Sequence, residues 1–201
     1  PLGLVSSSDG MQSLSDITEE DRIILPQPGS IQHILLSMAA EKTFGNAKYF
    51  DERLSTMKHP DGMQMILADG DIKLHYTSPP YLFEELNDPS NHLVIDAQTC
   101  FGGDFTFIVG MATEDLHENQ EAYNALTTAL EKSLTLINSD KDQTLKILSK
   151  SYDYDMVVLE DYIYNRGITY SGEVKGLSAF INFMKSNDYL SKDLKVEDVL
   201  W

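Results

Sequence analysis

Two short turns carry the residues of this chain that are best suited to hold a ligand. The first is Gln27-Pro28-Gly29-Ser30 and the second is Thr77-Ser78-Pro79-Pro80, and each directly follows an apolar stretch. Hydroxyls and free backbone N–H groups at the carboxyl ends of parallel strands are typical of ligand sites in open α/β sheets. The two turns therefore predict a ligand site at one edge of a sheet.

Three of the candidate residues also have a plain structural role open to them. Ser30 can cap its own helix through the N–H two or three residues on, which is worth about 1 kcal/mol. Tyr81, in the first turn of the following helix, can wall a pocket or lie half-buried in the core. His59 stands before a proline at a strand end, where it belongs either to a surface turn or to a ligand contact. The sequence leaves these alternatives open.

No motif of an enzyme or of a metal site is recognisable in the sequence. The five histidines do not pair with one another, with cysteine or with carboxylates at metal-ligand spacing, and Gly-x-Ser-x-Gly, P-loop and Rossmann glycine patterns do not occur. The single cysteine, Cys100, allows no internal disulfide and is typical of a buried small apolar residue. We therefore expect no catalytic residue, no metal and no cofactor.

The first candidate turn lies inside a strand, turn and helix unit that spans residues 22–42. Residues 23–25 form an apolar run typical of a strand covered on both faces, and two prolines end it. Ile31, Ile34, Leu35, Met38 and Ala39 then recur at helical spacing and predict one apolar stripe that faces the sheet. The start of this helix is thereby placed at the tip of a parallel strand.

Similar units follow along the chain. Strands are predicted over residues 54–57, 72–76 and 93–95, and helices begin at Pro60 and after Pro80. In the third strand apolar residues alternate with Lys73 and His75, which predicts one wetter face. Residues 16–97 thus read β-α-β-α-β-α-β, which implies a mostly parallel sheet.

The two ends of the chain carry different patterns. Residues 1–7 predict a strand, and Ser13 is expected to cap a short helix. Residues 105–109 predict a long apolar strand. Helices are predicted over residues 122–137, 145–149, 156–164 and 177–184.

The composition excludes several kinds of partner. The 201 residues are 42% hydrophobic and carry a formal charge of -17. Without a basic stripe the chain is not expected to bind nucleic acid or an anionic membrane surface. An anionic ligand would have to be held by local dipoles such as helix N-termini.

With these elements in place, the sequence resembles the substrate-binding proteins of nitrate/sulfonate/taurine-type ABC importers. The resemblance rests on the PQPGSIQH turn at residues 26–33, on HPDGMQMILADGDIKLHYTSPPYLFEEL at residues 59–86, and on the order of the elements around them. It extends to the segment 11–17, to Gly102-Gly103 before a return strand, to TEDLHEN at 113–119 and to the tail SKDLKVEDVLW at 191–201.

The resemblance implies an α/β protein with a type II periplasmic-binding-protein fold, in which two lobes with mostly parallel sheets close around a small molecule. Residues 1–15 would be a hinge strand and a portion of lobe 1, residues 16–97 the complete lobe 2, and residues 98–201 the return hinge strand and the C-terminal helical part of lobe 1. The N-terminal half of lobe 1 is expected to be missing from this chain, and no signal sequence is present in it.

The resemblance also implies a binding function without chemistry. The chain would capture a sulfonate, nitrate, bicarbonate or pyrimidine-like solute and deliver it to an ABC permease, in the periplasm or on a lipid-anchored cell-surface protein. The implied contacts come from the two turns and the helices after them: Gln27, Ser30, Gln32, His33, Ser78 and Tyr81, with His59 as a rim residue.

Two other functions remain as alternatives, a pyrimidine-precursor synthase on the same fold and the ligand-sensing domain of a transcription regulator. The missing half-lobe has a further consequence, because it would leave apolar faces around residues 105–109 and 122–137 uncovered. We therefore expect this chain alone either to associate with a second copy through those faces or to bind solute more weakly than a complete protein.

Overall fold

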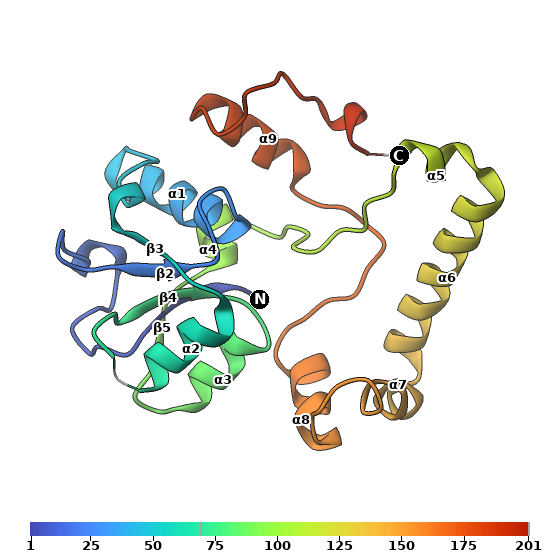
Figure 1. Ribbon diagram of the computed structural model, residues 1–201, viewed down its shortest axis with the longest axis horizontal. Coiled ribbons are helices and arrows are strands. Elements are labelled where there is room, and N and C mark those ends of the chain that lie inside the picture. Colours follow the sequence, from blue (N-terminus) through green and yellow to red (C-terminus); the bar gives the residue numbers. More distant parts are fainter. Residues whose placement is uncertain (69, 201) are drawn as a thin grey trace. The chain divides into compact units, whose positions relative to one another are not determined.

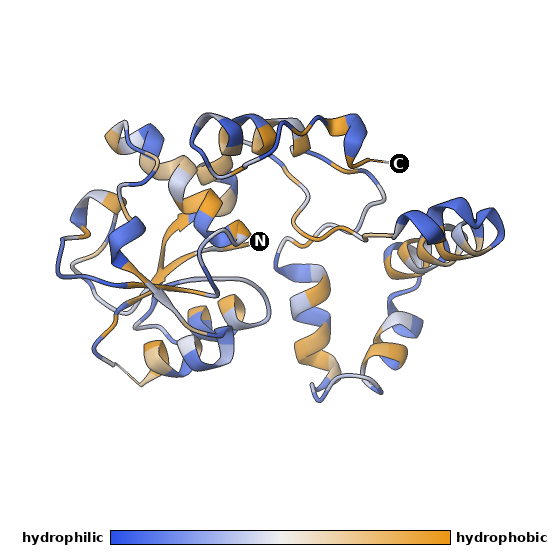
Figure 2. Cartoon of the chain, turned by 45° about the horizontal axis from the view of Figure 1, so that its top comes forward, coloured by the Kyte–Doolittle hydropathy of each residue, from blue (hydrophilic) through white to orange (hydrophobic). Residues whose placement is uncertain are grey.

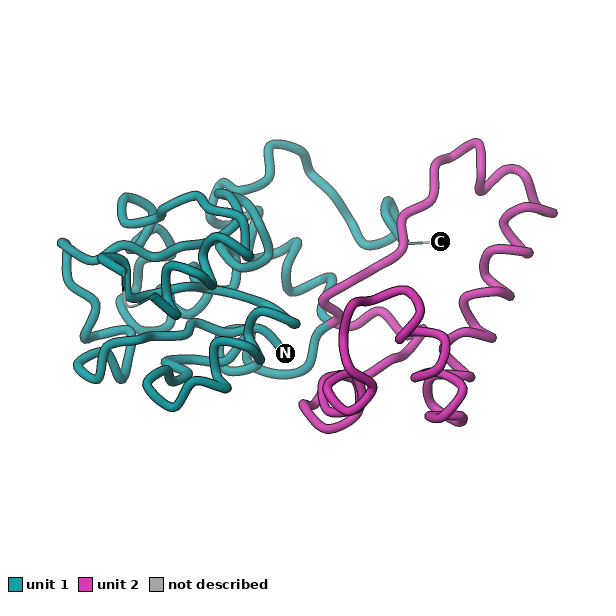
Figure 3. The backbone as a smooth tube through the Cα atoms, turned by 60° about the horizontal axis from the view of Figure 1, so that its bottom comes forward, with its two compact units in different colours: residues 1–105, 176–201 teal, residues 106–175 magenta. Residues whose placement is uncertain are grey.

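The computed structural model describes residues 1–68 and 70–200, and these form two compact units. One unit comprises residues 1–105 and 176–201, and the other comprises residues 106–175, as Figure 3 shows in two colours. Asp69, which the sequence places at the end of a predicted helix, and Trp201, the last residue of the tail motif, lie outside the described residues.

The first unit is built on a five-stranded sheet with the order β3-β2-β4-β1-β5 (Figure 1). The strands are β1 (Gly3–Ser6), β2 (Ile23–Leu25), β3 (Leu54–Thr56), β4 (Leu74–Thr77) and β5 (His92–Asp96). β2 pairs in parallel with β3 and β4, whereas β1 is antiparallel to both β4 and β5. Four strands therefore run in one direction, and the mostly parallel sheet predicted from the sequence is confirmed.

Helices cover both faces of this sheet. Figure 1 shows α1 (Ile31–Phe44) and α4 (Ala97–Phe101) on one face, and α2 (His59–Leu67) and α3 (Tyr81–Asn87) on the other. The three strands β1, β2 and β4 have no exposed residue, and Figure 2 shows apolar, orange strands at the centre of this unit. The wholly apolar β2 is typical of a sheet that is covered on both faces.

Helix α1 is buried on more sides than the single apolar stripe predicted from the sequence. Every residue from Gln32 to Ala40 is buried, because the sheet covers one side and α4 and the C-terminal segment cover others. The hydroxyls of Ser37 and Tyr189 lie 3.0 Å apart, and Lys42 donates to the Cys100 carbonyl oxygen at 2.8 Å. The prediction of a single apolar face was wrong for this helix, since periodicity does not show that several elements pack around it.

The first unit takes in segments from both ends of the chain. β1 lies inside the sheet between β4 and β5, and residues 1–15 belong to the same compact unit as the rest of the sheet. Residues 176–201, which include α9 (Leu177–Ser186), also belong to this unit, where Phe180 packs on Phe101 and Phe105 with ring centroids 4.8 and 5.5 Å apart. The assignment of either unit to a lobe remains a prediction.

The second unit is helical. It contains α5 (Glu114–Glu118), α6 (Gln120–Ser139), α7 (Lys141–Leu148) and α8 (Met156–Glu160), and α8 continues into a π-helical turn over Asp161–Asn165. Its core is the cluster of Leu145, Leu159 and Ile163. No residue of the 20-residue helix α6 is fully buried, and Leu130 is 50% exposed. The predicted helices are confirmed, and α6 carries an uncovered apolar side.

The predicted strand over residues 105–109 was wrong. Thr106 exchanges two hydrogen bonds with the backbone of Lys175, but no ladder forms and Ile108 is 77% exposed. An apolar run becomes a strand only where a partner strand satisfies its backbone groups, and the described residues provide none here.

Short 3-10 helices complete the described structure. They are η1 (Leu14–Asp16), which begins after Ser13 as predicted, η2 (Asp51–Arg53) and η4 (Val196–Asp198). None of the helices in the described part of the chain is long and apolar enough to cross a membrane.

Gly62 in α2 allows that helix to lie directly against the sheet. A Cβ atom there would come within 2.8 Å of two atoms of the His75 ring and 3.0 Å of the Ile24 side chain. We expect Gly62→Ala to destabilise the chain by about 1–3 kcal/mol, because the buried ring has no room to move and overpacking outweighs the better helix propensity of alanine. Urea unfolding would measure the change.

Gly10→Ala is the matched control, since a Cβ at Gly10 would have no neighbour closer than 3.8 Å. It should alter the free energy of unfolding by no more than about 0.5 kcal/mol. A Gly62→Ala variant as stable as this control would contradict the close packing of α2 on β4.

Candidate functional site

The two candidate turns follow neighbouring strands whose connections lead to opposite sides of the sheet. β2 connects through α1 to β3 on one side, whereas β4 connects through α3 to β5 on the other side. β2 and β4 are neighbours, so the turns that follow them flank a topological switch point at the carboxyl edge of the sheet. Ligands of open α/β sheets bind at such points.

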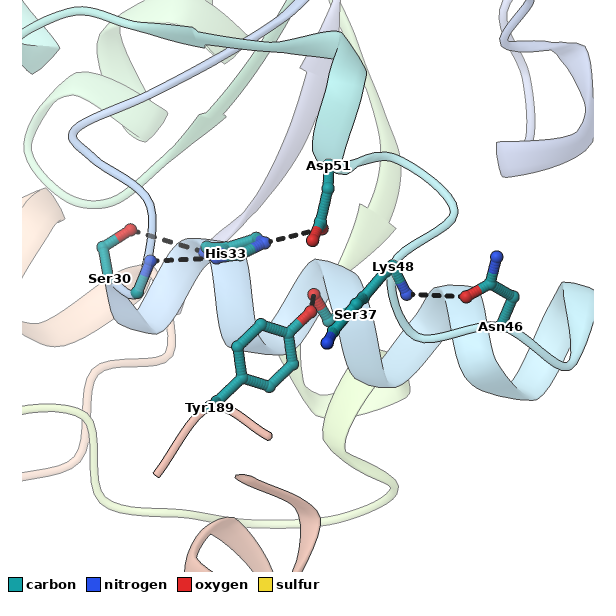
Figure 4. Close-up of polar contacts among 8 residues, drawn as sticks. Ser30, His33, Ser37, Asn46, Lys48, Asp51 and Tyr189 are labelled. Atoms are coloured by element: carbon teal, nitrogen blue, oxygen red, sulfur yellow. Dashed lines mark hydrogen bonds and ion pairs between the residues drawn. The ribbon is translucent and has the colours of Figure 1, made fainter. Parts of the chain in front are cut away.

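Ser30 is the N-cap of α1. Its Oγ accepts the backbone N–H of His33 at 3.4 Å, and the preceding Gly29 has a positive φ of 80°, which glycine adopts readily (Figure 4). The capping role that the sequence left open is therefore present. A contact of Ser30 with a solute remains a prediction.

His33 holds this turn in place. The backbone N–H of Gly29 donates to Nδ1 of His33 at 2.9 Å, so the hydrogen of the neutral ring lies on Nε2, which donates to Asp51 at 3.0 Å. The ring is buried and meets the Tyr189 ring edge-on at 5.3 Å (Figure 4). Both nitrogens of His33 are thus engaged within the protein.

His59, at the start of α2, contacts residues at the starts of α1 and α3. Nε2 of His59 lies 3.1 Å from the Gln32 amide nitrogen of α1, and Nδ1 lies 3.3 Å from the Thr77 hydroxyl at the end of β4. The Tyr81 ring of α3 stacks on His59 at 5.7 Å, with 25° between the planes. Gln32, His59 and Tyr81 therefore form one polar cluster at the edge of the sheet.

A buried pair lies behind this cluster. Nδ1 of His59 is also 3.0 Å from Nε2 of His75, and Nδ1 of His75 is 2.6 Å from Oε1 of Glu85. The side chains of His75 and Glu85 are both 0% exposed. Among the described residues, Oε2 of Glu85 has no hydrogen-bond partner.

Burial controls the protonation of these groups. Desolvation, together with the neighbouring His75, lowers the pKa of His59 to about 4, so His59 is neutral near pH 7. Desolvation also raises the pKa of Glu85, although the hydrogen bond from His75 opposes the change. The interior of the cluster thus disfavours charge on either group.

The structure brings some of the seven predicted contact residues together and leaves others apart. The structure brings Gln32, His59 and Tyr81 together, and it places Ser30 and His33 one step away at the head of α1. Gln27 is exposed and only its carbonyl oxygen is engaged in the turn, by the N–H of Ser30 at 3.2 Å. Ser78 is buried at the end of β4, and its carbonyl oxygen accepts the N–H of Leu82.

The sequence did not predict the buried pair behind the cluster, His75 and Glu85. The alternation of Lys73, His75 and apolar residues predicted a wetter face, but β4 is buried on both sides. No role was predicted for Glu85, which is buried in α3. The available signal was that a histidine and a glutamate flank the second candidate turn at residues 77–80.

Comparison with known proteins identifies the architecture. No protein-family model and no curated protein sequence matches the chain. Among solved structures it is similar to the periplasmic aliphatic sulphonate binding protein SsuA from Escherichia coli, with a TM-score of 0.72 and 17% sequence identity, over 100% of this chain and 68% of that one. The chain has a periplasmic-binding-protein fold.

The periplasmic-binding-protein fold agrees with the resemblance found in the sequence, which is confirmed at the level of the fold. It also agrees with the mixed sheet, in which one antiparallel strand lies among parallel ones. The identity of the contact residues on this periplasmic-binding-protein fold stays a prediction.

The lowered pKa of His59 predicts how stability depends on pH. His59 binds a proton less readily in the folded chain than in the unfolded chain. Its contribution to the free energy of unfolding is therefore present above the ordinary pKa near 6.5 and is lost as the pH falls from there toward 4. The free energy of unfolding should therefore fall more steeply in the wild type than in His59→Gln over this range. Urea titrations at successive pH values would measure both slopes.

Gln64→Ala is a suitable control, because Gln64 is exposed on the same helix α2 and does not titrate. The slope of its free energy of unfolding against pH should match that of the wild type. Equal slopes for His59→Gln and the wild type would show that His59 is not held neutral by its surroundings.

Proposed function

We propose that the chain is the solute-binding component of an ABC importer, which captures a small anionic or polar solute outside the cytoplasm and delivers it to a permease. The observation that carries this proposal is the fold similarity to a periplasmic sulphonate-binding protein over the whole of the present chain. Nitrate, bicarbonate and pyrimidine-like molecules are further solutes that we propose to test.

The carboxyl edge of the sheet supplies groups suited to such a solute. α1 and α2, of 14 and 9 residues, both begin at this edge, and their first-turn N–H groups carry the positive ends of the helix dipoles. Gln32 and His59 add neutral hydrogen-bonding groups, and Tyr81 adds an aromatic face. Since the chain has a net charge of -17, local dipoles of this kind are needed to hold an anion.

The chemistry of the unit favours binding over catalysis. Cys100 is buried, accepts a hydrogen bond from the Tyr76 hydroxyl at 3.3 Å, and has its pKa raised by burial to about 11. A thiol in this state is not a nucleophile near neutral pH. In the polar cluster Gln32 hydrogen-bonds to His59 and Tyr81 stacks on it, and such non-covalent contacts suit reversible capture of a solute.

We assign the sheet unit to one lobe of the binding protein and residues 106–175 to the other. The proposed site lies on the sheet unit, at the starts of α1, α2 and α3. Gln27, Ser30, Gln32, His33, Ser78 and Tyr81 remain the proposed contacts, with His59 at the centre of the cluster rather than at its rim.

A thermal-shift screen would identify the solute, with aliphatic sulfonates, nitrate, bicarbonate and pyrimidine precursors each tested at millimolar concentration. For the best of these, we expect Tyr81→Ala to weaken binding about tenfold and Tyr81→Phe to weaken it much less. The reason is that stacking of the ring contributes about 0.5–1.5 kcal/mol and does not need the hydroxyl. Isothermal titration calorimetry would measure the affinities.

Tyr152→Ala, a change at an exposed tyrosine in residues 106–175, provides the control and should bind as the wild type does. Similar losses for Tyr81→Ala and Tyr81→Phe would instead assign the contact to the hydroxyl. A chain that no solute in the panel stabilises would contradict the proposed function.

A further inference from the structure

Four side chains from four elements form an unbroken series of hydrogen bonds. Glu85 of α3 bonds to His75 of β4 at 2.6 Å, His75 bonds to His59 of α2 at 3.0 Å, and His59 bonds to Gln32 of α1 at 3.1 Å. The series begins at the Glu85 carboxyl group, which has no exposed surface. It reaches the carboxyl edge of the sheet at the half-buried His59 imidazole, which bonds to Gln32.

We propose that Glu85 and His75 are positioning residues for His59, and that the three form a proton relay which fixes the tautomer of His59. The relay decides whether Nε2 of His59 offers a hydrogen or a lone pair at the candidate site. Its effect on a solute rests on the proposed function, whereas the relay itself is a property of the solute-free chain.

The first state of the relay has Glu85 ionised. The carboxylate accepts Nδ1–H of His75, which leaves Nε2 of His75 as an acceptor for Nδ1–H of His59. Nε2 of His59 then carries a lone pair and accepts a hydrogen from the Gln32 amide. In this state the edge offers an acceptor at His59.

The second state holds one more proton. A proton from water binds Nε2 of His59, the hydrogen on Nδ1 of His59 passes to Nε2 of His75, and the hydrogen on Nδ1 of His75 passes to Oε1 of Glu85. Both imidazoles end neutral with their hydrogens on Nε2, Glu85 becomes a neutral acid, and the Gln32 amide turns its oxygen to His59. The edge now offers a donor.

The surroundings favour this route over a charged imidazolium. Glu85 is wholly buried with Oε2 unpartnered among the described residues, and burial raises its pKa, which shifts the balance toward the neutral acid. The pKa of His59 is lowered by burial and by His75. Burial thus favours a neutral Glu85 and a neutral His59, which is the arrangement of the second state.

Few other ionisable groups lie on the elements that pack around the relay. β1 and β2 carry none, and β4 adds Tyr76, which is bonded to Cys100. The remaining ones are Lys58 and Asp61 at the start of α2, Lys73 before β4, His33, Glu41 and Lys42 in α1, and Tyr81 and Glu84 in α3. None of these groups shifts the pKa of His59 or of Glu85, whereas His75, a member of the relay, acts on both.

The relay makes a chemical prediction for the solute. An anion accepts hydrogen bonds, so it favours the donor state of His59 and draws one proton into Glu85. A solute with an amino or hydroxyl hydrogen favours the acceptor state and draws none.

Nuclear magnetic resonance of the solute-free full chain, labelled with ¹⁵N-histidine, tests the relay directly, because the shifts of ring nitrogens distinguish the two neutral tautomers from the imidazolium. As the pH falls, we expect His59 and His75 to change together from the Nδ1–H to the Nε2–H tautomer, while both stay neutral. In Glu85→Gln the common change should disappear. In Glu84→Gln, the same substitution one residue earlier on α3, it should persist.

Three results would overturn the relay: His59 becoming an imidazolium while His75 is unchanged, the two histidines changing at separate pH values, or both keeping one tautomer throughout the range in which the chain is folded. The wild-type titration decides among these even if Glu85→Gln does not fold. Because no solute is present, the outcome is independent of whether the chain binds any member of the solute panel.

Discussion

The hydrogen bond between His75 and Glu85 is the interaction on which the candidate site depends. Two ionisable side chains with no exposed surface meet at 2.6 Å, and each is the buried partner that the other requires. Removing one partner of such a pair costs far more than the pair itself contributes, because the remaining group stays buried without a partner. The pair joins β4 to α3, and the close approach of Gly62 to the His75 ring adds α2 to the same arrangement. Both helices are therefore fixed relative to the sheet from inside the protein.

This constraint accounts for the form of the candidate site. His59 projects from the buried pair to the sheet edge, where it contacts Gln32 and Tyr81, so three helix starts share one polar cluster. At the other side of α1, His33 bonds both to Gly29 and to Asp51 and secures the turn that carries Ser30. The ligand groups proposed for the edge are thus held by buried histidines rather than by the loops alone. Prior positioning of this kind lowers the entropic cost of binding a small solute.

The sequence predicted the architecture well, because a parallel α/β unit leaves strong local signals. Apolar runs such as residues 23–25, prolines at their ends and helical spacing after them identify each strand and helix. It did not predict what surrounds an element. His75 looked half-exposed because alternation suggests one wet face, and residues 105–109 looked like a strand although no partner strand exists for them among the described residues. The role of Glu85 depends on a contact with His75 across two elements, which no local pattern contains.

We propose that a solute binds at the carboxyl edge of the sheet, over the cluster around His59. The most direct measurement is a map of backbone amide shift changes in the ¹⁵N-labelled chain as the best solute of the panel is added. We predict that the largest changes fall at residues 30–33, 59–62 and 78–82, where the three helices begin. Changes concentrated at the opposite ends of the strands, or confined to residues 106–175, would contradict the account.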